Sequence, residues 1–276
     1  MKNLLLTTAA LFALGAVSSA AAADMPAAPV DKASAPPVPI WTGFYVGANV
    51  GYGWDSRTAD FSGTPNIAIE FTGGVLPTLL SPSPKGWLGG GQLGYNWQFA
   101  TLLVAGLEAD FAATSIKGTT SVSPVVAGFP DLFTTTLSSS VKWFGTVRAR
   151  LGYLPADKLL VYLTGGFAFG ETQLNFNTTE FTFGGNCGFG LRCANGSASG
   201  VKPGWAAGAG VEGMIDPNWS VKAEYLRVDL GTQSVTAPTN ALPVGIITLT
   251  AHRTLVENTA RVGLNYRFGG PVVAKY

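Results

Sequence analysis

Few residues of this chain carry side chains that could act as a nucleophile, a general base or a metal ligand. The one histidine, His252, stands in TLTAHRTLVENT with Thr254 and Glu257 nearby, and a hydrolase would need such a base, nucleophile or activating carboxylate. Side chains of a strand alternate between its two faces. His252 and Thr254 would therefore share one face and Glu257 would point from the other, so the chain is not predicted to be an enzyme.

Two glycine-rich runs, Gly86 to Gly91 and Gly204 to Gly210, superficially match a dinucleotide-binding turn. Such a turn must follow a strand and open a helix, whereas both runs fall inside segments with strand character. Glycine is better explained here as making room in a narrow, strongly curved sheet. No cofactor and no metal site are expected.

The first 40 residues have the pattern of a targeting segment and a linker. Lys2, an apolar run from Leu4 to Val17 and the small residues 21–23 indicate a secretory signal peptide over residues 1–23. The apolar run is too short for a membrane helix, which needs about 20 residues. Residues 24–40 are rich in Pro and Ala and are interpreted as a flexible periplasmic leader. Residues 41–276 then form one β domain with a short C-terminal tail.

The two cysteines, Cys187 and Cys193, lie in the glycine-rich segment GGNCGFGLRCANGS. In an exported chain a close pair of this kind usually forms a disulfide, and no histidine stands near to complete a metal site. We predict a Cys187–Cys193 disulfide and keep a ligand or redox role as the alternative.

The composition separates the chain from an ordinary secreted enzyme. Only 12% of its residues are charged, where about 25% is usual for a soluble domain, yet no apolar stretch after the signal peptide is long enough for a membrane helix. Closed β-barrels are the remaining way to satisfy backbone groups in lipid. The net charge of +1 provides no basic footprint for nucleic acid, so no nucleic-acid partner is expected.

Eight segments alternate apolar and polar residues with a period of two, which is the pattern of strands. In the first, Phe44, Val46 and Val50 share one face, while Asn49 and the intervening glycines share the other. The eight segments cover residues 44–57, 86–100, 102–111, 141–153, 159–170, 204–215, 219–228 and 255–268.

The connections between these segments alternate in length. Three are tight turns, at residues 100–101, 155–158 and 216–218. Four are long and rich in Gly, Ser, Thr and Pro, near residues 58–85, 113–139, 176–201 and 231–252. This pattern predicts an all-β fold: an eight-stranded antiparallel up-and-down transmembrane barrel with short periplasmic turns and four long extracellular loops.

The polar face of these strands carries charges that nearly balance, as a confined lumen requires. We predict a lumen closed by a charge network, with Glu108 and Asp110 meeting Arg148 and Arg150 across neighbouring strands. The charges assigned to the lumen are Glu108, Asp110, Lys142, Arg148, Arg150, Glu212, Lys222, Glu224, Glu257, Arg261 and Arg267.

Aromatic residues cluster at the strand ends, as in the two interfacial girdles of a barrel that faces lipid. A soluble barrel with an apolar interior is the alternative, but its outer face should be densely charged, and here the polar face is sparse and glycine-rich. The predicted girdles are Trp41, Phe44, Trp97, Phe99, Tyr153, Trp219 and Phe268 beside the turns, and Trp54, Trp87, Trp143 and Trp205 beside the loops.

The order of the phrases WTGFYVGANVGYGW, GGGQLGYNWQ, RARLGY, GWAAGAGVE, NWSVKAEYLRVDLG and RVGLNYRFGGPVVAKY resembles the RopB-type family. These are small outer-membrane proteins of rhizobia-like alphaproteobacteria, related to the group-3 surface antigens of Brucella and often labelled as a porin family. The resemblance implies an OmpA-like eight-stranded barrel in the cell outer membrane, exported by the general secretory pathway and surrounded by lipid and lipopolysaccharide.

The resemblance also bears on assembly and ligands. Barrels of this kind usually end on an aromatic residue that the barrel-insertion machinery reads; Phe268 ends the strand pattern, but GGPVVAKY follows it, so Phe268 and Tyr276 both compete for that role. Some relatives are described as haemin-binding, but no motif carries that activity onto particular residues of this chain.

Three functions remain open at this point. An eight-stranded barrel is filled by side chains, which favours a structural and surface-interaction role over solute passage as a porin. The third possibility is a receptor for haem or another extracellular ligand. Loop aromatics could bind such a ligand or could pack loop against loop; they are Phe61, Phe71, Phe129, Phe133, Phe181 and Phe183.

Overall fold

The computed structural model describes residues 41–63, 76–124, 132–182, 185–187, 193–240 and 247–268. The predicted signal peptide and leader, and the tail with Tyr276, lie outside the described residues, as do Phe71, Phe129 and Phe183. No helix in the described part of the chain is long and apolar enough to cross a membrane.

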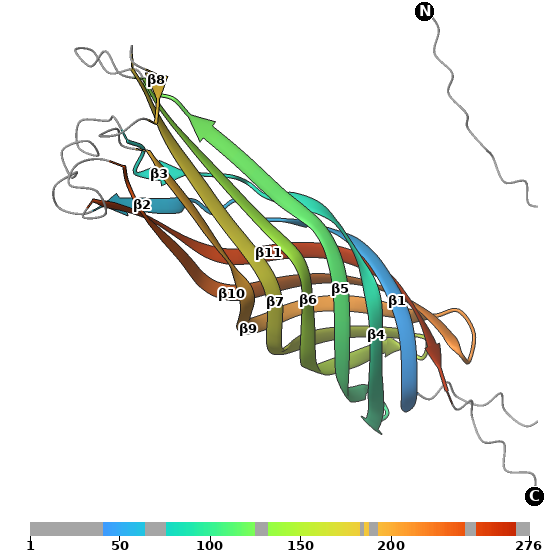
Figure 1. Cartoon of the computed structure of the whole chain (residues 1–276). Helices are drawn as coiled ribbons and strands as arrows, with labels where there is room; N and C mark the ends of the chain where they lie inside the picture. The colour runs from blue at the N-terminus through green and yellow to red at the C-terminus, as the bar shows by residue number, and fades with distance from the viewer. Residues whose placement is uncertain are drawn as a thin grey trace, which may run out of the picture. The chain divides into compact units, whose positions relative to one another are not determined.

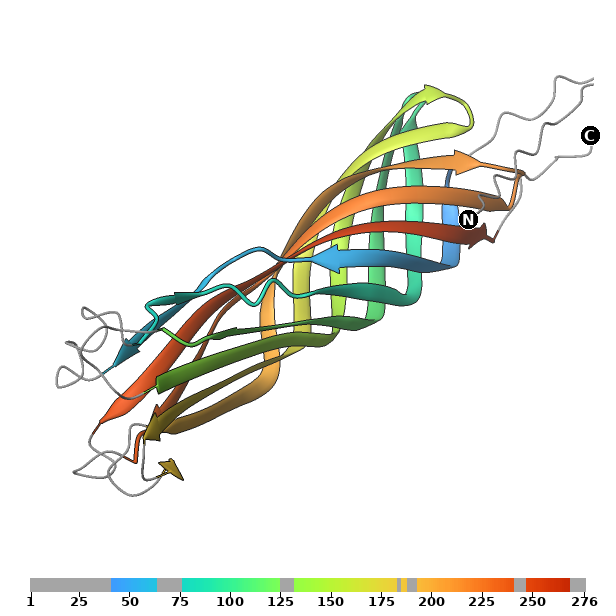
Figure 2. The same ribbon diagram turned by 90° about the horizontal axis from the view of Figure 1, so that it is seen from above.

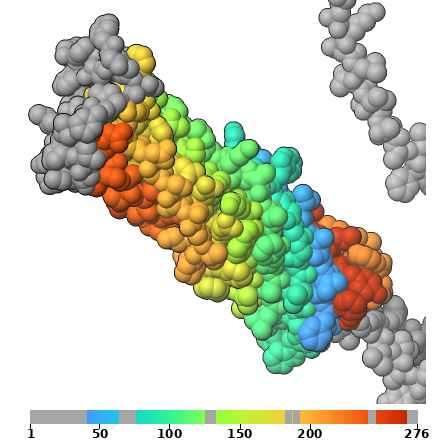
Figure 3. Space-filling view, viewed as in Figure 1, coloured from blue at the N-terminus to red at the C-terminus, as the bar shows by residue number. Residues whose placement is uncertain are grey.

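The described residues fold into one antiparallel sheet that closes on itself. Its eight long strands follow one another in space as they do in sequence, and the first, β1, also pairs with the last, β11. In the space-filling view, the side chains of neighbouring strands form an unbroken surface over the visible face (Figure 3). The eight strands are β1 (Gly43–Trp54), β4 (Lys85–Ala100), β5 (Leu103–Val122), β6 (Leu132–Ala156), β7 (Leu159–Thr182), β9 (Ala194–Met214), β10 (Trp219–Pro238) and β11 (Thr248–Arg267).

The two ends of the barrel differ as predicted. Tight turns at residues 101–102, 157–158 and 215–218 join strands at one end, where β1 also begins. At the other end lie three short strands, β2 (Ala59–Gly63), β3 (Leu79–Leu80) and β8 (Gly185–Asn186) (Figure 1). Short turns mark the periplasmic rim of such barrels, so the opposite end is extracellular.

The outward surface of the barrel is apolar in a belt, and we take this belt as the membrane-spanning part. On β11 the belt begins at Ala260, and it continues to Phe268, the residue after the strand. The outward residue that precedes Ala260 is Asn258, which accepts a hydrogen bond from the Tyr225 hydroxyl. Exposed aromatic side chains border the belt: Phe44, Trp97, Phe99, Tyr153, Trp219 and Phe268 below, and Trp54, Trp87 and Trp205 above. Trp143 belongs to the upper group through ring contacts with Phe111 and Phe169.

The long extracellular connections prove to be mostly strand, which corrects the loop boundaries predicted from the sequence. The strands β5, β6, β7, β9, β10 and β11 all run past the belt, well into the segments expected to be loops (Figure 2). For example, β5 and β6 stay paired as far as Val122 and Thr135, inside the expected loop 113–139. Serine and threonine made these segments resemble loops, although threonine is a good strand former.

Beyond the membrane belt the cylinder divides into two sheets. Pairing between β9 and β10 ends at Trp205 and Asp229, and above this point β9 pairs only with β7 while β10 pairs only with β11, as far as the described residues show. On the other side, β4 begins at Lys85, so β5 beyond Lys117 pairs only with β6. One sheet thus contains the upper parts of β5, β6, β7 and β9 together with β8, and the other contains the upper parts of β10 and β11 together with β2 and β3. We call these two sheets the cap.

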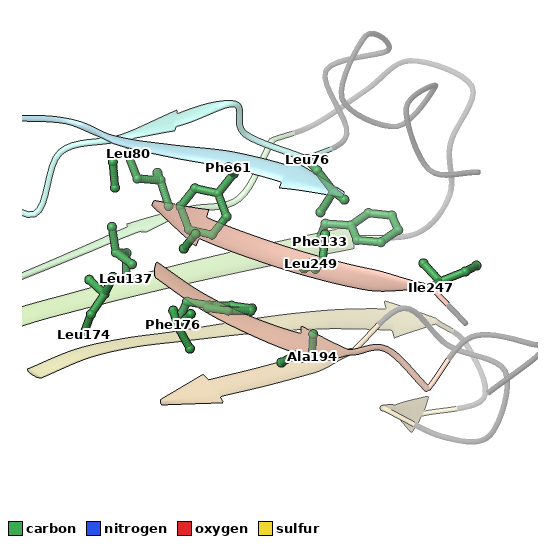
Figure 4. Packing of buried hydrophobic residues seen from close by; sticks show 14 residues of the cluster. Phe61, Leu76, Leu80, Phe133, Leu137, Leu174, Phe176, Ala194, Ile247 and Leu249 are labelled. Atoms are coloured by element: carbon green, nitrogen blue, oxygen red, sulfur yellow. The ribbon is translucent and has the colours of Figure 1, made fainter. Parts of the chain in front are cut away.

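The two sheets of the cap pack face to face over an apolar core. Phe61 of β2 meets Phe176 of β7 edge-on, with ring centroids 5.8 Å apart. Leu80, Phe133 and Leu249 are buried in the same cluster, and their side chains point between the sheets (Figure 4). Along the membrane belt apolar residues face outward, whereas in the cap they face inward.

Irregular pairing marks the level at which the barrel becomes the cap. Register shifts occur between Val141 and Trp143 on β6, and between Asp229 and Thr232 on β10. Gly231 has a φ of +73° there, which favours glycine, and its amide donates to Asp229 Oδ1 over 2.9 Å. The shift on β6 turns Lys142 outward, so the predicted lumen position of Lys142 is wrong.

Candidate functional site in the barrel interior and on the cap

The membrane part of the barrel contains a charge network centred on Arg148. Glu108 and Arg148 are direct partners in the register of β5 and β6. Arg148 Nη2 lies 2.6 Å from Glu108 Oε1 and 2.7 Å from Asp110 Oδ2, and Arg148 Nη1 lies 3.1 Å from Glu224 Oε2. One buried guanidinium therefore holds three carboxylates from two sides of the lumen.

Three further cations complete the network. Arg150 Nη2 lies 2.7 Å from Glu212 Oε2, and Lys222 Nζ donates to both Glu108 oxygens over 2.9 Å. Arg261 Nη2 contacts Asp110 Oδ2 over 3.2 Å and also pairs with Glu224. All eight side chains are buried, and the four carboxylates balance the four cations: Glu108, Asp110, Glu212 and Glu224 against Arg148, Arg150, Lys222 and Arg261. A buried set of ions persists only when it is compensated in this way.

Two tyrosines and the glycines beneath them fit around these charges. The Arg150 guanidinium lies 4.0 Å from the ring centroid of Tyr162 and 5.7 Å from that of Tyr45, within the range of cation–π attraction. Tyr162 donates to Glu224 over 3.0 Å and Tyr45 donates to Glu108 over 2.7 Å. A Cβ at Gly210 would lie only 2.6 Å from the Tyr162 ring, so glycine makes room for the tyrosine there.

The charge pattern of the sequence does not identify these two tyrosines as lumen residues, although the alternation of the strands carries a signal for them. Tyr45 has the same parity as Asn49 on the polar face of its segment, but it carries no charge and so does not belong to the charges predicted for the lumen. Tyr162 stands between Val161 and Leu163 in an apolar run with weak alternation. Strict counting by twos from Thr164 would have placed Tyr162 inside the barrel.

Two residues expected in the lumen network lie outside it. Arg267, near the periplasmic rim, donates to the Pro217 carbonyl over 2.6 Å. Glu257 lies beyond the membrane belt, where it is buried near Asp55 and Arg253. Among the described residues, Arg253 Nη2 donates to Asp55 Oδ2, while Glu257 Oε2 has no hydrogen-bond partner. Burial, with a smaller contribution from the negative charge of Asp55, raises the pKa of Glu257 to about 8.

Apolar layers close the interior on both sides of the charges. Near the periplasmic rim, Trp41 packs inside the barrel against Val104 and Leu160, and its indole Nε1 donates to the Asp157 carbonyl over 3.1 Å. The assignment of Trp41 to the lipid-facing girdle is therefore wrong. A second layer lies toward the cap and includes Ile116 and Phe144; the core of the cap lies beyond it.

The cysteines form a disulfide at the cap. Cys187 and Cys193 are bonded, with their Cα atoms 5.4 Å apart, which confirms the predicted pairing. The Glu180 amide on β7 donates to Cys193 Sγ over 3.2 Å, and the Asn240 amide donates to the Cys193 carbonyl over 3.1 Å. The disulfide thus lies where one sheet of the cap meets the end of β10.

The outward face of the cap is lined with hydroxyl groups. Thr119 and Ser138 bond across β5 and β6 over 2.9 Å, and His252 Nδ1 lies 2.7 Å from Ser234 Oγ on the other sheet. Thr254 also points outward, 3.2 Å from Thr232, whereas Glu257 is buried inside. The side chains of His252, Thr254 and Glu257 therefore do not converge on one site. The described residues also include no group of three or more His, Cys, Asp or Glu arranged to hold a metal ion.

Comparison with known proteins agrees with this architecture. The model of the family described as "Outer membrane protein beta-barrel domain" matches residues 9–268. The chain belongs to this family. The 31 kDa outer-membrane immunogenic protein of Brucella melitensis is 36% identical over 97% of this chain and 100% of that protein.

Two further relatives are more distant. The 25 kDa outer-membrane immunogenic protein of Brucella abortus is 26% identical over 97% of this chain and 99% of that protein. The 22 kDa outer membrane protein of Rhizobium leguminosarum is 26% identical over 86% of this chain and 82% of that protein. These relatives confirm the predicted resemblance to small alphaproteobacterial outer-membrane proteins. The chain is an outer-membrane β-barrel protein, and its apolar belt faces the lipid of that membrane.

Proposed function

We propose that this outer-membrane barrel is a closed structural protein that presents a folded β cap at the cell surface. The observation that carries the proposal is the filling of its interior at successive levels: the apolar layer around Trp41, the charge network around Arg148, the apolar layer around Phe144 and the core of the cap around Phe61. Solute passage would require all four levels to open.

The hydroxyl-lined outer face of the cap supports a surface-interaction role. Its Ser and Thr hydroxyls form hydrogen bonds with one another across neighbouring strands, as at Thr119 and Ser138 or Thr236 and Thr250. This face is therefore stable in water without a partner. The names of the Brucella relatives describe them as immunogenic. By analogy, we propose that the cap is the part of this protein that antibodies reach on intact cells.

Conductance of purified, refolded protein in a planar bilayer tests the closed-barrel proposal. We expect no steady current above the lipid baseline, with a known trimeric porin as the positive control in the same buffer. Insertion must be verified independently by protease protection of the barrel in matched vesicles. A steady current from inserted, folded protein would refute the proposal.

Porin-like passage and binding of haemin or another ligand remain the alternatives. Of the aromatics that could bind such a ligand, Phe61 and Phe133 are buried in the cap core, while Phe181 is exposed. The buried pair would have to leave the core before it could stack on a haem ring. Haemin titration of folded wild-type protein and of Phe181→Ala, followed by absorbance, tests this alternative directly.

We also propose that Phe268 is the aromatic residue read by the insertion machinery. Its amide donates to the Phe44 carbonyl over 2.8 Å, and its ring lies 5.1 Å from that of Tyr266. Phe268→Ala should slow outer-membrane insertion in cells, whereas removal of Tyr276 should not. The reverse result would assign the role to Tyr276.

A further inference from the structure

Three lysines gather on the outside of the barrel where the membrane belt meets the cap. Lys85 on β4 and Lys117 on β5 are exposed and are direct partners in the register of these two strands. Lys117 in turn pairs with Ser140 on β6, two residues from the outward-turned Lys142. Three adjacent strands thus place three cations on one face, and we call Lys85, Lys117 and Lys142 the lysine cluster.

The charges of this cluster are only partly compensated by the protein. Lys142 Nζ lies 2.7 Å from Glu171 Oε1, and Glu171 also accepts from the Trp143 indole over 2.9 Å. Within the described part of the chain, Lys85 and Lys117 have no ion-pair partner. Like charges directly opposite each other across two strands destabilise the pairing. The register therefore leaves a local excess of positive charge that an external anion would stabilise.

The height of the cluster on the barrel indicates the source of that anion. Lys85 stands two residues above Trp87 on the same outward face, and Lys142 is adjacent to Trp143, which stacks on Phe111 with centroids 5.4 Å apart. Tryptophans of such girdles lie at the level of the lipid headgroups. Amino groups immediately beyond the upper girdle therefore lie among the headgroups of the outer leaflet.

We propose that Lys85, Lys117 and Lys142 form a binding site for an anionic lipid headgroup of the outer leaflet, with the acyl chains lying against Trp87, Phe111 and Trp143. The like-charged pair Lys85–Lys117 binds the phosphate or carboxylate of the headgroup, and Lys142, held by Glu171, borders it. The outward aromatic rings below the cluster provide the apolar surface on which the acyl chains of the same lipid lie.

Binding of diphosphorylated lipid A to the folded protein in zwitterionic micelles, measured by native mass spectrometry, tests the site. We expect retention of lipid A by the wild type, with affinity lowered about 25-fold in Lys85→Gln/Lys117→Gln because each lysine near an anionic surface contributes about fivefold. Lys85→Arg/Lys117→Arg should retain binding. The matched control is Lys158→Gln, which removes an exposed lysine from a periplasmic turn and should leave binding unchanged.

Two further measurements separate a lipid site from a general attraction of anions or from a purely structural role. Inorganic phosphate should not displace lipid A at millimolar concentration, because it lacks acyl chains. Lys117→Glu should abolish lipid binding while raising resistance to urea in lipid-free micelles, because it replaces a repulsive cross-strand pair with an attractive one. Equal lipid A affinity in the wild type and the double Gln variant, or displacement by inorganic phosphate, would overturn the proposal.

Discussion

Replacing Arg148 by alanine tests whether the charge network stabilises the barrel. The change removes the contacts of one guanidinium with Glu108, Asp110 and Glu224 and leaves the eight-residue network with one excess negative charge. Breaking a buried ion pair by removing one partner typically costs about 3–5 kcal/mol. Each carboxylate keeps another cation, Lys222 for Glu108 and Arg261 for Asp110 and Glu224, so we expect a loss of about 3 kcal/mol.

The measurement is the free energy of unfolding in urea for protein refolded in zwitterionic micelles, followed by tryptophan fluorescence and by gel mobility. Lys142→Ala is the matched control, because its pair with Glu171 is exposed and exposed ion pairs contribute little to stability. Adding Glu224→Gln to Arg148→Ala restores charge balance, so the double variant should recover part of the loss. A value for Arg148→Ala within about 1 kcal/mol of wild type, or no recovery in the double variant, would refute this reasoning.

Conductance of the same variant distinguishes stability from closure. If charges alone filled the lumen, removing Arg148 would open a path for ions. Apolar layers around Trp41 and Phe144 lie on either side of the network, however, and neither layer depends on Arg148. We therefore expect Arg148→Ala to be less stable than wild type and still to conduct no current.

Three other perturbations have definite outcomes. Cys187→Ser/Cys193→Ser should still insert and fold, with the cap weakened by about 2 kcal/mol because the closed ring is small; thiol labelling of unreduced wild type would contradict the disulfide. Because burial raises the pKa of Glu257 to about 8 from an ordinary value of 4.5, the unfolded state ionises first as the pH rises. The unfolding free energy of wild type relative to Glu257→Gln should therefore fall by up to about 1.4 kcal/mol per pH unit between pH 4.5 and about pH 8, and should level off above pH 8. A difference that does not change with pH would refute the burial of Glu257. Gly210→Ala should destabilise the barrel by about 1–3 kcal/mol through its clash with Tyr162, and urea titration that finds no loss would contradict the packing.

Much of the membrane part follows from the sequence because a strand has a strict period of two. Once Arg148 and Arg150 are assigned to the polar face, Glu108 and Asp110 share that inward face on the neighbouring strand. The register then places Glu108 opposite Arg148, and Asp110 opposite Thr146. Eight of the eleven charged residues assigned to the lumen are found in the network, and Lys142, Glu257 and Arg267 lie outside it. Glu257 also points inward, but it lies on β11 beyond the membrane belt and so cannot reach the charge network. The alternation of a strand fixes the face on which a residue lies, and it does not fix the position of that residue along the barrel axis.

The features that sequence patterns missed depend on departures from that period or on tertiary packing. The register shift beside Trp143 moves Lys142 to the outside of the barrel. No local residue pattern in the sequence predicts this shift. Trp41 precedes the first strand, and its burial depends on strands that lie far away in sequence. The cap was missed because its apolar residues are spaced by Ser and Thr, which resemble loop residues when the water-facing side of a strand is not known.

Along a single strand, the apolar residues face outward in the membrane belt and inward in the cap. This reversal explains how one sheet is stable both in lipid and in water. In lipid the outward residues must be apolar, and the charges held inside the small lumen must compensate one another. In water the same strands bury apolar side chains such as Phe133 and Leu249 between two sheets and expose hydroxyls such as Thr136 and Thr250. A sheet that separates into two halves needs bends where it leaves the membrane, and the bulges beside Trp143 and Gly231 lie at that level. The outward hydroxyls contribute little to the cap core, so the surface that meets the environment can change its residues while the fold beneath it persists.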